Sequence, residues 1–144
     1  MSVIVEFFTA PDDASAALAL RTGPRRAFES VSFGNFDPEE AVVEWQCLLA
    51  GGSFDDLVDA GEPRPVAGQD DDGCLVFAIS PGLAAALAEA GGSELEDAAV
   101  AWSSQRAADG EVIGTDIASV ILGDLAVLAR SARRQGQEVY CWVA

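Results

Sequence analysis

Carboxylates, arginines, three cysteines and one tyrosine are the side chains with which this chain could do chemistry. It has 24 Asp and Glu against 8 basic residues, all of them Arg, and it contains neither His nor Lys. Without an imidazole there is no Ser–His or Cys–His nucleophile pair and no histidine ligand for a metal. Without an amine there is no Schiff base and no phosphate-loop lysine. The composition leaves acid–base work by carboxylates, or recognition.

Glu40 and Glu44 are placed as a pair, since residues four apart lie on one face of a helix. Paired carboxylates can act as general acid and base when burial drives their pKa values apart. Glu39 and Glu40, however, fall in the first turn of the expected helix, where acids stabilise the positive end of the helix dipole. Helix capping is therefore favoured over catalysis.

The acidic run Asp70–Asp72 precedes Gly73 and suggests a calcium loop. Such a loop needs acids at its first, third and fifth positions, glycine at the sixth and glutamate at the twelfth. Counting back from Gly73, the first position is Gly68 and the twelfth is Ile79, so the pattern fails. We predict no metal site and no cofactor.

Six arginines form two groups: Arg21, Arg25 and Arg26, then Arg130, Arg133 and Arg134. Guanidinium groups suit phosphate and carboxylate ligands, because their paired N–H groups match two oxygens. Each group also lies at or just past the expected end of a helix, where positive charge is favourable. We favour this structural role over an anion site.

The three tryptophans, Trp45, Trp102 and Trp142, lie on expected apolar faces or in an expected buried strand, so core packing is the favoured role. The alternative is a ligand pocket lined by Trp45 and Trp102, with Gln46 as its polar contact. These three residues are our candidate binding site. Cys141, in the buried strand, is interpreted as an inert packing residue.

The overall charge favours some partners and excludes others. A formal charge of −16 over 144 residues repels nucleic acid and anionic membranes, and it suits a basic protein. The cysteines form no CxxC pair, and we find no leader and no membrane helix, so we expect a cytoplasmic protein with reduced thiols. Abundant Ala, Gly and Arg without Lys indicates a bacterial, GC-rich genome. The length predicts one domain, 1–144.

Helix starts are well marked. Helices are expected over 37–51 and 80–91, each beginning with a capping side chain followed by proline and ending at glycine. A short helix starts at Ser53. Ser93 and Glu96 form a capping box that starts a further helix.

The longest helix is expected from Thr115 to about Gln135, with Gly136 as its left-handed stop. Its buried stripe is predicted to consist of Ile117, Ile121, Leu125 and Leu128, widened by Val120 and Ala132.

Strands are fewer, over 3–8, 74–79 and 138–143, with a weak one over 28–33. The first and last are almost continuously apolar, as in strands covered on both faces. Segment 61–73, rich in Pro, Gly and Asp, is expected to be a solvated loop. The prediction is an α+β fold, with a small mixed or antiparallel sheet that includes both terminal strands and about five packing helices.

The order of these pieces is informative as well. The chain opens with MSVIVEFF, has a tryptophan helix ending in LLAG, continues through FAISPGLAAALAEA and closes with RRQGQEVYCWV. This order resembles the bacterial YfbM-like family of small cytosolic proteins, a domain of unknown function. The resemblance spans nearly the whole chain and implies fold and location, but no mechanism. The family pattern has a tryptophan where this chain has Val42 and a histidine where it has Gln46, so no histidine-dependent activity is implied.

Function is expected to be non-catalytic binding of another protein, a basic one, through an acidic surface. The alternative is a small-ligand-binding domain that uses Trp45, Gln46 and Trp102. A third class is an enzyme that depends on carboxylates or on a metal they hold.

The helix pattern yields one direct test. We expect Ile121→Asp to unfold the protein or lower its melting temperature severely, because it places an unpaired charge on the buried face of the long helix. Thermal melting followed by circular dichroism measures this. A soluble variant with unchanged melting would show that the helix face is assigned wrongly.

Overall fold

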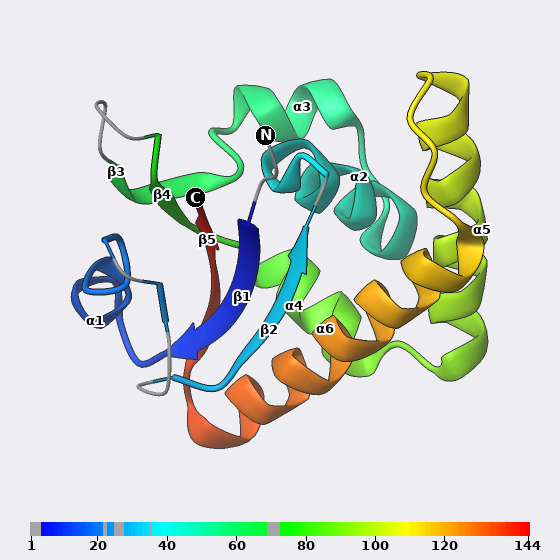
Figure 1. The fold of residues 1–144 in the computed structure, drawn as a ribbon. Helices are drawn as coiled ribbons and strands as arrows, with labels where there is room; N and C mark the ends of the chain where they lie inside the picture. The colour runs from blue at the N-terminus through cyan, green and yellow to red at the C-terminus, as the bar shows by residue number, and fades with distance from the viewer. Residues whose placement is uncertain (1–3, 22, 25–27, 35, 69–72) are drawn as a thin grey trace.

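The computed structural model describes residues 4–21, 23–24, 28–34, 36–68 and 73–144. Within them the chain forms five strands and six helices (Figure 1). In chain order these are β1 Ile4–Ala10, α1 Asp13–Ala17, β2 Ser30–Gly34, α2 Pro38–Ala50, α3 Phe54–Asp59, β3 Arg64–Gly68, β4 Leu75–Ala78, α4 Pro81–Glu89, α5 Gly92–Ala108, α6 Thr115–Gln135 and β5 Glu138–Val143.

Strands from the two ends of the chain lie side by side inside one sheet. The strand order is β2-β1-β5-β4-β3, and every neighbouring pair is antiparallel. In the central pair, Phe7 of β1 lies opposite Cys141 of β5. The predicted α+β fold with both terminal strands in the sheet is thereby confirmed, and the sheet is antiparallel rather than mixed.

The larger core lies between the sheet and helices α2, α4, α5 and α6. Alternate strand residues, among them Phe7, Phe77 and Cys141, contribute to it from the sheet. Trp45 of α2 and Trp102 of α5 are completely buried here. This face holds most of the apolar surface that folding removes from water, the main favourable term in stability.

The opposite face of the sheet is covered as well, by α1 and the turns that follow it. Phe8, Tyr140 and Trp142 point to this side and pack with small residues of the α1 segment. The indole of Trp142 donates to the carbonyl oxygen of Leu20, 2.8 Å away. Burial on both faces explains why β1 and β5 are almost continuously apolar in sequence, as expected for covered strands.

Capping side chains mark the starts of α2 and α4. Asp37 accepts the backbone N–H of Glu39 at 3.0 Å, so α2 begins with its acids in the first turn. Ser80 accepts the backbone N–H of Leu83 at 3.0 Å and starts α4. α6 ends at Gly136, which has the left-handed conformation expected of it. In the described part of the chain, no helix combines the length and apolarity that crossing a membrane requires.

The expected loop over 61–73 is wrong in part, because β3 runs through it. β3 pairs with β4 at the edge of the sheet, with a register irregularity between Pro65 and Ala67. Proline is compatible with an edge strand, since one side of that strand needs no ladder hydrogen bonds. The run Asp70–Asp72 lies outside the described residues.

Two helix expectations are also corrected. The capping box at Ser93 and Glu96 is wrong: α5 begins at Gly92, with Gly91 as its cap, and Glu96 instead accepts the hydroxyl of Ser119 at 2.9 Å. The bounds of α6 are as predicted, but Ile117 and Val120 lie on its exposed side. The residues that α6 does bury are Ala118, Ile121, Leu122, Leu125, Ala126, Leu128, Ala129, Ser131 and Ala132.

Gly23 provides a stability test of the packing between the α1 segment and the sheet. Its φ is +77°, and an added Cβ would lie 2.9 Å from Cζ3 of Trp142. Gly136 is the matched control: its φ is +66°, and a Cβ added there would meet no atom of the described residues within 4 Å. We expect Gly136→Ala to lose about 1 kcal/mol from backbone strain, and Gly23→Ala about 3 kcal/mol because a steric clash is added. Urea unfolding measures both, and equal losses would contradict the clash.

Candidate functional site

One buried guanidinium meets four carboxylates near the end of α5. Nη2 of Arg106 lies 3.1 Å from Oε1 of Glu40 and 2.8 Å from Oδ2 of Asp109, and it also contacts Oε2 of Glu44. Nη1 lies 3.3 Å from Oε2 of Glu111. Nη2 has two hydrogens for three carboxylates, so the acceptors outnumber the donors.

The residues of this group come from α2, from α5 and from the turn after α5. Glu40 and Glu44 lie one turn apart on α2, as their spacing predicts. Arg106 follows Trp102 by one turn on α5, and Asp109 and Glu111 follow the end of that helix. Helices α2 and α5 pack against each other in the larger core. The charged group is thus placed by the packing of two helices.

Glu44 is the most deeply placed of the four acids, at 9% exposed. Its Oε1 accepts the indole N–H of Trp102 at 2.9 Å, while Oε2 contacts Arg106. Burial raises the pKa of Glu44 above its ordinary value, and the Trp102 hydrogen bond and the charge of Arg106 offset this only in part. Glu44 therefore acts as an anchor that joins the two helices.

Arg106 is itself 6% exposed. Its burial acts to lower its pKa, but the charges of Glu44 and Glu40 outweigh that effect and the pKa is raised. Among the described residues, its Nε has no hydrogen-bond partner. Four carboxylates against one guanidinium give the group a formal charge of −3 when all are ionised, so negative charge remains in excess.

A cleft of about 520 Å³ opens over this group. Glu40, Glu44, Arg106 and Asp109 line it together with Phe54 of α3, whose side chain is 39% exposed. An aromatic ring beside carboxylates is a favourable environment for an organic cation, because the ring face also attracts positive charge. We call this feature the acidic cleft: Glu40, Glu44, Cys47, Gly52, Phe54, Gln105, Arg106, Ala108 and Asp109.

The acids of the acidic cleft also raise the question of a metal. Carboxylate oxygens of Glu40, Glu44 and Asp109 lie within 4.8 Å of one another, close enough to share an ion. Nη2 of Arg106, however, contacts all three carboxylates. The Arg106 guanidinium is thus the cation that these three carboxylates share in this structure.

The three sequence-predicted site residues are only partly brought together. The rings of Trp45 and Trp102 lie 5.1 Å apart at 70°, edge to face, and both residues are completely buried. Gln46 points elsewhere: it accepts the hydroxyl of Ser80 at 2.5 Å, at the start of α4. Ligand binding by these three residues stays a prediction, and the observed contacts are those of core packing.

Two further sequence observations have structural counterparts. Arg130 donates to the carbonyl oxygens of Ala88 and Ala90 at 3.1 and 2.9 Å, so it neutralises the C-terminal end of α4. The other arginine group is described only at Arg21, which is exposed, since Arg25 and Arg26 lie outside the described residues. Cys141 is fully buried, and burial raises the pKa of its thiol well above the usual value, as expected of an inert packing residue.

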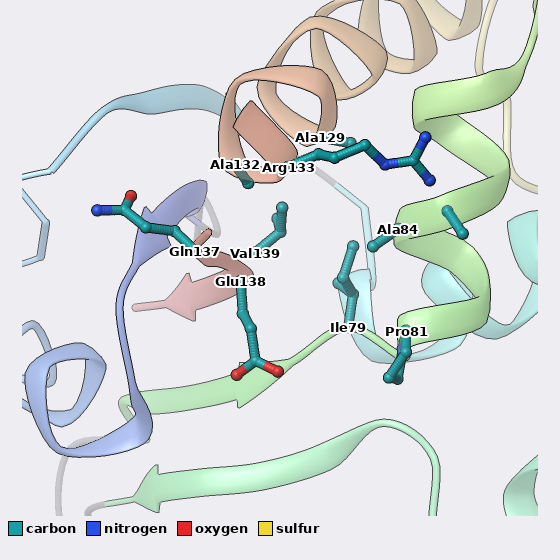
Figure 2. A pocket seen from close by; sticks show the side chains of 10 residues that line it. Ile79, Pro81, Ala84, Ala129, Ala132, Arg133, Gln137, Glu138 and Val139 are labelled. Atoms are coloured by element: carbon teal, nitrogen blue, oxygen red, sulfur yellow. The ribbon is translucent and has the colours of Figure 1, made fainter. Parts of the chain in front are cut away.

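A second, smaller pocket lies between α4, α6 and the start of β5 (Figure 2). Its volume is about 250 Å³ and its walls are mostly apolar, with Arg133 and Glu138 at the rim. Arg133 lies 3.3 Å from Glu89, and Glu138 accepts the hydroxyl of Tyr140 at 2.9 Å. Because its charged groups have partners within the chain and its volume is below that of ordinary ligand sites, it is the weaker candidate.

Comparison of the chain with family models, with curated proteins and with solved structures gave no significant match. The resemblance to the YfbM-like family therefore stays a prediction.

Sequence reasoning placed Glu40 and Glu44 on one helix face but favoured helix capping there, and it missed Arg106, Asp109 and Phe54. The missed signal is the position of Arg106, one turn after Trp102 on an apolar helix face. An arginine at such a position is buried and needs carboxylates nearby.

The buried pair gives a pH-dependent prediction. We expect Arg106→Leu to lower the free energy of unfolding by about 3–5 kcal/mol at neutral pH, because Glu44 loses its counter-charge. In this variant the pKa of Glu44, already raised, rises further. The loss of stability comes from burying the ionised Glu44 carboxylate, so it is present at pH values above the ordinary pKa of glutamate. The difference from wild type should therefore shrink at about pH 4.

Chemical denaturation at both pH values measures this effect. The matched control is Arg133→Leu, whose ion pair with Glu89 is more than half exposed at both ends and should change stability by less than about 1 kcal/mol. A loss for Arg106→Leu that is the same at both pH values would contradict the role assigned to Glu44.

Proposed function

We propose that this protein is a non-catalytic binding module whose acidic cleft receives a basic side chain of a partner protein. The observation that carries the proposal is the unbalanced charge: one guanidinium faces four carboxylates below an open cleft. Arg106 is an internal example of the chemistry, since these carboxylates already hold a guanidinium at hydrogen-bonding distance. A second guanidinium or an ammonium would reduce the remaining excess.

Three other features support the proposal. Phe54 adds a partly exposed ring to the cleft, suited to stacking on a guanidinium. The charge of −16 attracts a basic partner over distances up to the Debye length and raises the association rate. The Glu44 carboxylate has its oxygens bonded to Trp102 and Arg106, which suits an anchor better than a general acid.

We expect a labelled peptide of six arginines to bind and to be released by salt. The double variant Glu40→Gln with Asp109→Asn should weaken this binding about tenfold, because it removes two charged acceptors at the mouth of the cleft. Phe54→Ala should weaken it by a smaller factor. Fluorescence anisotropy at about 0.05 M and about 0.3 M NaCl measures both effects.

The control removes the same charge elsewhere. Glu29→Gln with Asp97→Asn changes two exposed acids that do not line the cleft. Equal weakening by the two double variants would show that only net charge matters and would exclude the cleft. Binding that does not change with salt would exclude electrostatic recognition altogether. An equally tight, cleft-dependent complex with free spermine would favour a small-ligand function over a protein partner.

A further inference from the structure

The exposed side of α6 carries apolar side chains that the fold leaves uncovered. Ile117 is 55% exposed, and Val120 and Val127 are each 59% exposed. They lie on the longest helix, outside the set of residues that this helix buries in the larger core. Sequence patterning placed Ile117 and Val120 in the core, so the apolar surface of α6 is wider than the face that is buried.

A row of exposed and half-exposed residues runs along this side of α6, parallel to the helix axis. We define the α6 seam as the residues Asp116, Val120, Gly123, Val127, Arg130 and Arg134. Their spacings alternate between four and three, the spacing that keeps positions aligned along a helix that meets another helix. The seam begins with an acid, has valines and glycine in the middle and ends with arginines.

The packing within one copy of the chain does not explain why the seam contains a glycine, Gly123. A glycine inside a helix costs about 1 kcal/mol relative to alanine. A Cβ added at Gly123 would meet no atom of the described residues within 4 Å, so no contact among them requires glycine at this position. A glycine on an exposed helix face does allow a second helix to approach closely.

The seam is complementary to itself when two copies run antiparallel. With the twofold axis beside Leu125, Asp116 lies opposite Arg134 of the second copy, and Gly123 lies opposite Val127. The twofold axis repeats each pair. Two ion pairs therefore lie at the ends of the seam, Val120 lies opposite Arg130 on each side, and valine lies against glycine at the centre. A wholly acidic or wholly basic partner would meet repulsion at one end of the seam.

We propose that a second copy of this chain docks on the α6 seam to form a twofold-symmetric dimer. A chain with a charge of −16 repels its own copies over most approaches. On the seam, acid and base are instead segregated along the helix, so antiparallel docking brings opposite charges together. The acidic cleft has no residue on α6, so this dimer and the proposed function are independent.

Sedimentation equilibrium of the full chain tests the apolar centre. We expect the wild type to be dimeric and Val127→Asp to be monomeric, with unchanged circular dichroism. The matched control is Val112→Asp, at a valine 93% exposed outside the seam, which should stay dimeric. A wild type that is monomeric at about 1 mM chain concentration would overturn the proposal, as would equal dimerisation of the two variants.

A charge-exchange experiment tests the antiparallel register. Asp116→Arg alone and Arg134→Asp alone each put like charges opposite each other at both ends, and each should weaken dimerisation about tenfold. An equimolar mixture of the two variants restores opposite charges at both ends, so mixed dimers should form with wild-type affinity. A mixture that associates no better than either variant alone would refute this arrangement.

Discussion

The burial of Arg106 is the constraint on which the candidate site depends. Its guanidinium is enclosed where α5 packs on α2, and a buried charge is tolerated only when counter-charges meet it. Glu44 supplies the nearest one and also holds Trp102, so one carboxylate joins the charged group to the aromatic core. Removing Arg106 would leave the buried Glu44 carboxylate without its counter-charge, which is far more costly than never having buried the pair.

More acids surround Arg106 than its neutralisation requires. One carboxylate balances a guanidinium, yet four lie within 4 Å of it, two of them after the end of α5. Mutual repulsion among them is a cost to the isolated fold that a bound cation would relieve. The excess negative charge, together with Phe54 at the cleft, is therefore the basis of the proposed recognition of a cation.

The two proposed interaction surfaces differ in their physics. The acidic cleft is a concave region with a net negative charge, suited to attracting a positively charged partner. The α6 seam is nearly straight, apolar in its middle and opposite in charge at its ends, suited to a copy of itself. Asp116 and Arg134, at the two ends of the seam, give a strongly acidic chain opposite charges for an antiparallel contact with its own copy.

Local signals in the sequence were enough for most elements: the capped starts of α2 and α4, the bounds of α6 and the apolar strands β1 and β5. Caps, prolines, glycines and periodicity act within a few residues, so they can be read without a fold. The edge strand β3 and the exposed side of α6 could not be read in this way. β3 forms because it pairs with β4, and the elements packed against α6 decide which of its sides is covered. The tertiary structure alone brought Arg106 to Glu40 and Glu44, residues 66 and 62 positions away, because only helix packing brings such distant side chains into contact.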